Sequence, residues 1–199
     1  MAGAAPRLVT LLDMIERAYG KQKTSEPRDA YALLLRRNAG YPQSDANCAR
    51  GFAALEAQVG LEPAAILAAK LGALQTALRA GGIVPELRAQ RVREIATRVR
   101  DEFGGDLHAV LERPLPEARR ILASFPTVSE AGAEKILLFT RAAPVAALPS
   151  NCVHVPVRLR FGRAAKSWST CYRTAQEAIA AELPERVADR RASSRAPRR

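Results

Sequence analysis

The sequence has few aromatic residues, few cysteines and no long uninterrupted apolar run. Phe, Trp and Tyr make up 5% of the 199 residues, although hydrophobic residues of all kinds reach 48%. A core that is aliphatic and rich in Ala and Leu is typical of helix-on-helix packing. No stretch reaches the roughly 18 apolar residues of a membrane span, and charges interrupt the N-terminal segment, so we expect neither a membrane partner nor a secretory signal.

The three cysteines, Cys48, Cys152 and Cys171, are odd in number and widely spaced. This pattern predicts neither a disulfide framework nor a clustered metal site, and we interpret the thiols as ordinary small apolar residues. Free thiols are typical of a reducing compartment. We therefore expect an intracellular, cytoplasmic protein with no cofactor and no metal.

Positive charge is what the chain has in excess, with 31 Lys and Arg against 20 Asp and Glu and a formal net charge of +11. Such a chain favours a polyanionic partner, and nucleic acid and an anionic membrane both satisfy that charge; a basic surface that only aids solubility is the alternative. Residues 185–199 contain six Arg and no aromatic residue, which predicts a disordered basic tail.

Apolar residues recur with helical spacing along residues 1–184, so we predict one all-α domain there, with no strand. The first helix is expected to stop near Gly20 and to bury one face, formed by Leu8, Leu11, Leu12 and Ile15. Pro27 is expected in the first turn of the second helix, and Ser44 is expected to cap the third.

Prolines and glycines punctuate the rest of the helical pattern. Pro63 and Pro85 are expected to open two helices, the first of them broken at Gly72. Pro156 is expected to kink or delay the helix that contains it, because proline removes a helical hydrogen bond. A capping box at residues 174–177 is expected to begin the last helix.

Residues 115–141 carry the most informative pattern. A helix ends near Phe125, the segment Pro126-Thr127-Val128-Ser129 follows, and a second apolar helix begins at Ser129. In such a helix-hairpin-helix unit, the backbone N–H groups of the hairpin and of the second helix's N-terminus point at one spot. That arrangement suits a phosphate.

This unit resembles the hairpin of the helix-hairpin-helix DNA glycosylases of the endonuclease III type, which typically reads Leu-Pro-Gly-Val-Gly. The resemblance covers roughly residues 28–183 and includes the long basic helix of GGIVPELRAQRVREIATRVRDEFGGDL. It also includes the loop with Tyr41 and Gln43, similar to the family's loop that fills the gap left by an extruded base. It implies an all-α helix-hairpin-helix bundle, duplex DNA, intact or damaged, as the partner, and a DNA N-glycosylase of base-excision repair, with or without AP lyase activity.

Several positions depart from the family pattern. Thr127 and Ser129 replace the hairpin glycines, and an ungapped alignment puts the family's nucleophilic lysine at Ala131 and its catalytic aspartate at Pro149. No Asp or Glu occurs between Lys135 and Gln176, so a shifted alignment restores no aspartate. The resemblance thus implies an impaired or inactive enzyme. The iron–sulfur cysteines of the family are also missing, and no metal is implied.

Lys135, one helical turn beyond Ala131, is the candidate for a relocated nucleophile, with a phosphate or solvent lysine as the alternative. We predict DNA contacts from a set of hairpin and basic residues: Thr127, Val128, Ser129, Gly132, Lys135, Gln43, Arg158, Arg160 and Arg163. Three functions stay open: a glycosylase-like repair protein, a non-catalytic DNA-binding module on the same scaffold, and a basic helical protein with no repair role. We expect a monomer.

Overall fold

The computed structural model describes residues 7–21 and 24–183, and the basic segment 185–199 lies outside them. Over the described residues the chain forms eleven α-helices, one short 3₁₀ turn and no strand, so the predicted all-α class is confirmed. The chain divides into two compact units. The larger unit is residues 26–142, and the smaller combines the described residues before 26 with residues 143–183. A single domain over residues 1–184 stays a prediction.

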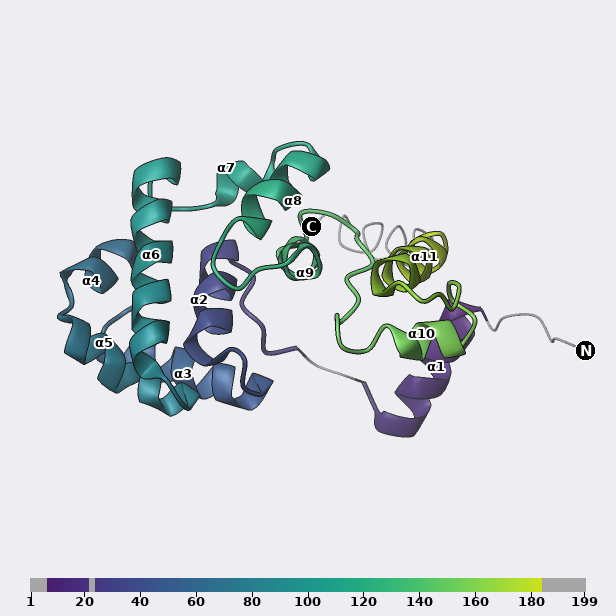
Figure 1. The fold of residues 1–199 in the computed structure, drawn as a ribbon, viewed down its shortest axis with the longest axis horizontal. Coiled ribbons are helices and arrows are strands. Elements are labelled where there is room, and N and C mark those ends of the chain that lie inside the picture. The colour runs from purple at the N-terminus through teal and green to yellow at the C-terminus, as the bar shows by residue number, and fades with distance from the viewer. Residues whose placement is uncertain (1–6, 22–23, 184–199) are drawn as a thin grey trace, which may run out of the picture. The chain divides into compact units, whose positions relative to one another are not determined.

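The larger unit is built around one buried helix (Figure 1). Its elements are α2 (Ala30–Gly40), α3 (Asp45–Gln58), α4 (Pro63–Ala68), α5 (Leu71–Leu78), the 3₁₀ turn η1 (Arg79–Gly81), α6 (Pro85–Phe103), α7 (His108–Leu111), α8 (Leu115–Ala123) and α9 (Glu130–Phe139). Nine of the eleven residues of α2 are buried. A helix that is apolar on most sides belongs inside a bundle, and α2 contacts α3, α6 and α9. Each neighbour is thereby positioned against α2.

Glycines allow α2 to end in close contact with its neighbours. A Cβ added at Gly51 of α3 or at Gly81 of η1 would overlap the carbonyl oxygen of Ala39. Only glycine permits backbones to approach so closely. The loop that follows α2 is therefore held in place by α3 and η1, and this loop carries Gln43.

Most of the predicted helix starts are confirmed. The Ser44 hydroxyl accepts a hydrogen bond from the Asn47 N–H at 3.3 Å, as expected of a cap. Pro63 and Pro85 occupy the first turns of α4 and α6. These signals are local, so the sequence alone was sufficient to predict them.

Two predicted boundaries in the larger unit are wrong. Helix α2 begins at Ala30 rather than near Pro27, because the Asp29 carboxylate caps it at the Ala32 N–H, 2.7 Å away. The chain breaks at Ala69 and not at Gly72, which lies inside α5. Arg93 of α6 accounts for the break, since its guanidinium donates to carbonyl oxygens at the end of α4.

The smaller unit contains α1 (Leu8–Tyr19), α10 (His154–Arg158) and α11 (Trp168–Ala180). Leu8 is buried as predicted, but Ile15 is 41% exposed, so its predicted burial is wrong. Proline is tolerated at 156 because α10 is short and Pro156 lies in its first turn, where no helical N–H bond is required.

The predicted capping box at residues 174–177 is also wrong, because α11 already begins at Trp168. The Thr174 hydroxyl donates to the Thr170 carbonyl within the helix and accepts from the Arg163 N–H at 3.0 Å. This residue therefore ties a loop to the helix instead of starting it. No helix in the described part of the chain is long and apolar enough to cross a membrane.

Candidate nucleic-acid interface

The turn between α8 and α9, residues 124–129, is a short hairpin closed by local hydrogen bonds. The Val128 N–H donates to the Phe125 carbonyl at 3.1 Å. Ser129 has an extended backbone, with φ −90°, and its hydroxyl accepts from the Gly132 N–H at 3.3 Å. Serine at this position is therefore a helix cap in an ordinary conformation, and the second helix begins next to it, as the sequence predicted.

Thr127 adopts the left-handed backbone, with φ 64°, that usually belongs to glycine. A β-branched residue there costs about 1–2 kcal/mol. Hydrogen bonds to α2 offset that cost: the Thr127 hydroxyl donates to Asn38 Oδ1 at 3.1 Å, and Arg37 Nε donates to the Thr127 carbonyl at 2.9 Å. Asn38 Nδ2 also donates to the Pro126 carbonyl at 3.1 Å. Thr127 thus keeps the turn of the glycine it replaces.

These bonds orient the two edges of the hairpin. The carbonyls of Pro126 and Thr127 face α2, where side chains donate to them. The N–H groups of Ser129, Glu130 and Ala131 make no hydrogen bond to any residue that the structure describes. Ser129 and Glu130 are exposed. Free donors at the positive end of a helix are the arrangement that favours a bound anion, and α9 is ten residues long.

The other predicted hairpin residues lie deeper. Val128 is 8% exposed, and Gly132 is buried with its N–H engaged by Ser129. A Cβ at Gly132 would lie 3.2 Å from Val128 Cγ1, so a side chain there would press on the hairpin. Val128 and Gly132 therefore support the turn from within, and Ser129 is at its surface.

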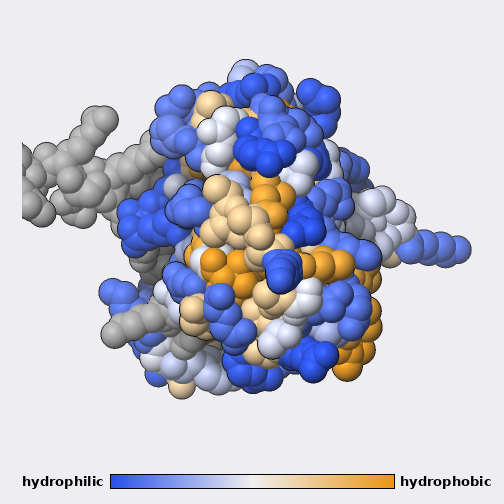
Figure 2. Space-filling view, turned by 90° about the vertical axis from the view of Figure 1, so that its left-hand side faces the viewer, coloured by the Kyte–Doolittle hydropathy of each residue, from blue (hydrophilic) through white to orange (hydrophobic). Residues whose placement is uncertain are grey.

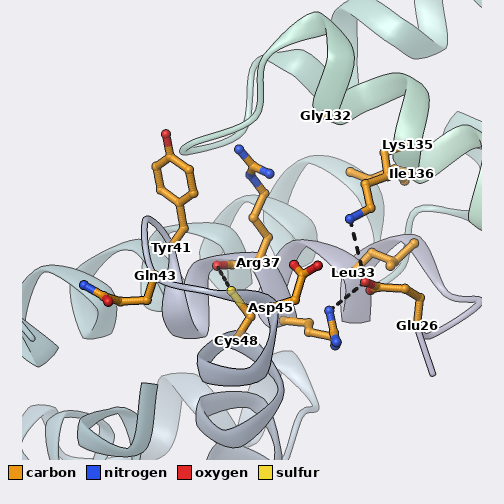
Figure 3. A pocket seen from close by; sticks show the side chains of 11 residues that line it. Glu26, Leu33, Arg37, Tyr41, Gln43, Asp45, Cys48, Gly132, Lys135 and Ile136 are labelled. Atoms are coloured by element: carbon orange, nitrogen blue, oxygen red, sulfur yellow. Dashed lines mark hydrogen bonds and ion pairs between the residues drawn. The ribbon is translucent and has the colours of Figure 1, made fainter. Parts of the chain in front are cut away.

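A small recess beside the hairpin is lined by two residues that the sequence predicted separately, Gln43 and Lys135, which lie well apart from each other in it (Figure 3). Its volume is about 90 Å³, well below the roughly 300–1,000 Å³ of ordinary small-molecule pockets. It is lined from α2, the loop after it, the start of α3 and α9. Its charged lining residues are Glu26, Arg36, Arg37, Asp45 and Lys135.

Lys135 lies in an ion pair within this recess. Its Nζ is 3.7 Å from Glu26 Oε1 and 5.5 Å from the centre of the Phe139 ring. Arg36 also donates to Glu26, at 2.8 Å. Glu26 and Asp45 are the carboxylates that share the recess with this amine. The recess thus combines an amine with two acids. Neither Ala131 nor Pro149, the positions that the family alignment assigns to catalysis, lines it.

The family's two catalytic positions fall on different units. Ala131 is half-buried in the first turn of α9, in the larger unit, and Pro149 is exposed ahead of α10, in the smaller. Asp106, another acid of the larger unit, accepts from the His108 N–H at the start of α7, at 2.7 Å. Its carboxylate is therefore committed to a structural bond.

Arg37 is a site residue that the sequence analysis missed. While its Nε holds the Thr127 carbonyl, its guanidinium lies 4.6 Å from the centre of the Tyr41 ring. One side chain therefore links the hairpin to the loop that carries Gln43. The four-residue spacing of Arg37 and Tyr41 could have predicted their contact. No pattern in the sequence could have predicted the hydrogen bond of Arg37 to Thr127, ninety residues away.

Exposed apolar residues next to Gln43 were also missed. Ile83 is 68% exposed and Val84 is 51% exposed, and Val84 has a left-handed φ of 58°. They follow Gly82, where an added Cβ would lie 3.1 Å from Gln43 Cγ. Figure 2 views the unit from its α4 and α5 side and also shows apolar residues on that face. Ile83 and Val84 therefore extend the Gln43 loop with an apolar edge.

Burial shifts the pKa values of two groups at the end of α2. Burial first, and Asp45 second, raise the pKa of the Cys48 thiol, whose S–H donates to the Arg37 carbonyl at 3.8 Å. Arg88 is 2% exposed and donates to the Gly40 carbonyl at 3.2 Å, and burial lowers the pKa of its guanidinium. Both groups hold the end of α2, and a protonated buried thiol is a poor nucleophile.

The three predicted basic contacts, Arg158, Arg160 and Arg163, lie in the smaller unit and are all exposed. Arg158 ends α10, and Arg160 has a left-handed φ of 69°. None of these guanidinium groups is paired with a carboxylate within the described ranges.

The fold matches solved structures of DNA glycosylases. A trapped endonuclease III–DNA covalent intermediate matches with a TM-score of 0.68 at 19% identity, over 88% of this chain and 78% of that chain. The H. pylori 3-methyladenine DNA glycosylase bound to 1,N6-ethenoadenine matches with 0.68 at 13% identity, over 91% and 84%. A thermostable thymine-DNA glycosylase matches with 0.61 at 13% identity, over 88% and 84%.

The sequence matches no protein-family model and no curated protein. The structural matches nevertheless show that the fold is that of the helix-hairpin-helix DNA glycosylases, as the hairpin pattern predicted.

Proposed function

We propose that this chain binds duplex DNA as a repair protein of the glycosylase fold, with the hairpin holding a backbone phosphate. The observation that carries the proposal is the orientation of the hairpin. Its carbonyls are taken by Arg37 and Asn38, and the N–H groups of Ser129, Glu130 and Ala131 have no acceptor in the described ranges. Backbone donors at a helix N-terminus bind phosphate without reading sequence.

The loop after α2 supports a role in base contact. Tyr41 is 40% exposed, and Ile83 presents an apolar side chain beside Gln43. Proteins that kink or open DNA insert apolar and amide side chains between bases, at a cost of a few kcal/mol for unstacking. Arg37 joins this loop to the hairpin, so a phosphate grip and a base probe would act together.

Substitutions at Glu130 test the hairpin directly. Proline is favoured in the first helical position, and the extended backbone of Ser129 is what a following proline requires. Glu130→Pro should therefore keep α9 while it deletes one outward N–H donor. Glu130→Ala removes the same carboxylate but keeps the donor, and is the matched control.

We expect Glu130→Pro to bind a short duplex about 10- to 100-fold more weakly than Glu130→Ala, the value of one hydrogen bond to a charged group. Fluorescence anisotropy at fixed salt measures the difference, and circular dichroism checks the helices. Equal affinity of the two variants would remove the hairpin from the interface.

Catalysis at Lys135 is a second candidate, favoured by one observation: the recess holds this amine together with Glu26 and Asp45. An amine that attacks an abasic-site aldehyde forms a Schiff base, which borohydride reduces to a stable covalent adduct. Duplexes with oxidised, deaminated or abasic positions are the substrates to test.

If Lys135 is a nucleophile, borohydride links the wild-type protein to the abasic duplex, and both Lys135→Ala and Lys135→Arg lose the adduct. If it is a cation beside phosphate, no wild-type adduct forms, and only Lys135→Ala weakens duplex binding. An adduct that survives in both variants would exclude Lys135 as its source.

A further inference from the structure

The single tryptophan of the chain, Trp168, is a fixed and half-exposed aromatic surface in the smaller unit. Its ring stacks on Tyr172, one turn further along α11, with centroids 4.9 Å apart and planes 23° apart. Its indole N–H donates to the Ser150 carbonyl at 3.1 Å. One face and the polar edge of the indole are thus engaged within the protein, while the residue as a whole stays 50% exposed.

Tyr172 makes this surface rigid. It is 8% exposed, and its hydroxyl donates to the Leu148 carbonyl at 3.3 Å. Trp168 and Tyr172 therefore hold the 148–150 segment by two carbonyls, and that segment in turn fixes both rings. An aromatic ring that is already ordered loses little conformational entropy when a flat ligand stacks on it.

The loop that leads to Trp168 supplies cations. It is tied along α11 by the Arg163 N–H, which donates to Thr174 Oγ1 at 3.0 Å, and by the Ala165 N–H, which donates to Cys171 Sγ at 3.2 Å. Arg163 and Lys166 are exposed, and neither side chain pairs with an acid among the described residues. The sequence has no Asp or Glu between Lys135 and Gln176.

The exposed ring of Trp168 and the nearby cations Arg163 and Lys166 indicate which class of ligand fits this surface. A cationic or neutral peptide ligand would gain nothing from this charge, whereas a polyanion with flat rings satisfies both features. The bases of an intact duplex stack on one another and present only their edges. An unpaired base offers its face.

We propose that the smaller unit binds an unpaired stretch of nucleic acid strand, with one base stacked on Trp168 and the flanking phosphates near Arg163 and Lys166. This inference adds a single-strand site to the proposed duplex binding. It rests on the proposed function only in taking nucleic acid as the ligand. An opened or gapped duplex carries both kinds of site.

Trp168 is its own reporter, because stacking a base on an indole quenches its fluorescence. The titrants are an oligothymidylate of about 12 nucleotides, a chain of abasic residues of the same length, and a fully paired duplex. We expect strong quenching at saturation by the oligothymidylate alone. The abasic chain carries the same phosphates without bases, so equal quenching by it, or none by the oligothymidylate, would overturn the proposal.

Variants separate stacking from charge. Trp168→Ala should bind labelled oligothymidylate about 5- to 150-fold more weakly, the range for loss of one stacked base. Trp168→Phe keeps a ring and should restore most of the affinity, and Tyr19→Ala, which deletes another exposed aromatic residue of the same unit, should bind as the wild type does. Wild-type affinity in a folded Trp168→Ala would contradict the site.

The outcome is distinguishable from that of the proposed function. Glu130→Pro, in the larger unit, should weaken duplex binding and leave the quenching by oligothymidylate unchanged. Quenching by oligothymidylate in a protein that does not bind duplex would contradict only the duplex proposal. Duplex binding without quenching by oligothymidylate would contradict only this inference.

Discussion

The buried amide of Asn38 stabilises Thr127 in a backbone conformation that glycine usually adopts. Its side chain is fully buried, donates to the carbonyls of Leu34 and Pro126, and accepts from the Thr127 hydroxyl. The left-handed backbone of Thr127 is held by these bonds. The replacement of glycine by threonine was visible in the sequence, but its partner, 89 residues away, was not.

We expect Asn38→Ala to lower the free energy of unfolding by about 2–3 kcal/mol, because it leaves buried hydrogen-bonding groups without partners. Thr127→Val keeps the β-branched shape and removes only the hydroxyl, and should cost about 1 kcal/mol. Urea unfolding of both single variants and the double variant gives their coupling. Strictly additive losses would show that the Thr127–Asn38 bond contributes nothing.

Two helix starts were predictable from a serine within one turn of them, but the start of α2 was missed although its cap, Asp29, is equally local. Ser44 and Ser129 begin their helices as capping chemistry requires. The predictions at Gly72 and at residues 174–177 failed, and both places carry bonds to distant groups: Arg93 donates to the carbonyls that end α4, and the Thr174 hydroxyl, inside α11, accepts from the Arg163 N–H. Local propensity was overruled by tertiary hydrogen bonds.

The candidate site was predictable in its parts and not in its assembly. Lys135 and Gln43 were chosen from motif position, and the structure places both on one recess. Arg37 and Ile83 were missed, since the first is defined by its contact with the hairpin and the second by its exposure. The composition of the chain indicates which class of ligand its surface attracts. The packing of α2 against α9 decides which residues lie together on that surface.

At the scale of the whole chain, the order and spacing of helices indicated the fold when identity did not. Matches at 13–19% identity retain TM-scores of 0.61–0.68. Fold is carried by many aliphatic positions that tolerate exchange, but a reaction depends on single residues. Ala131 and Pro149 stand where the family alignment expects a lysine and an aspartate, so DNA binding is the part of the family's function that we propose here.

A net charge of +11 makes salt the test of that binding. Each phosphate contact releases counterions, so the logarithm of affinity falls linearly with the logarithm of salt concentration, by about 0.9 per contact. Replacing Arg158, Arg160 and Arg163 by Gln should weaken duplex binding and reduce that slope by up to about three.

The matched control replaces three arginines that are already paired with carboxylates, Arg100, Arg113 and Arg173, and lowers the net charge equally. If general charge attraction were all that held the DNA, both triple variants would lose the same slope in a salt titration. If Arg158, Arg160 and Arg163 contact the DNA, the slope falls clearly in the first variant and little in the control. An arginine that is already paired with an acid displaces fewer counterions from the DNA.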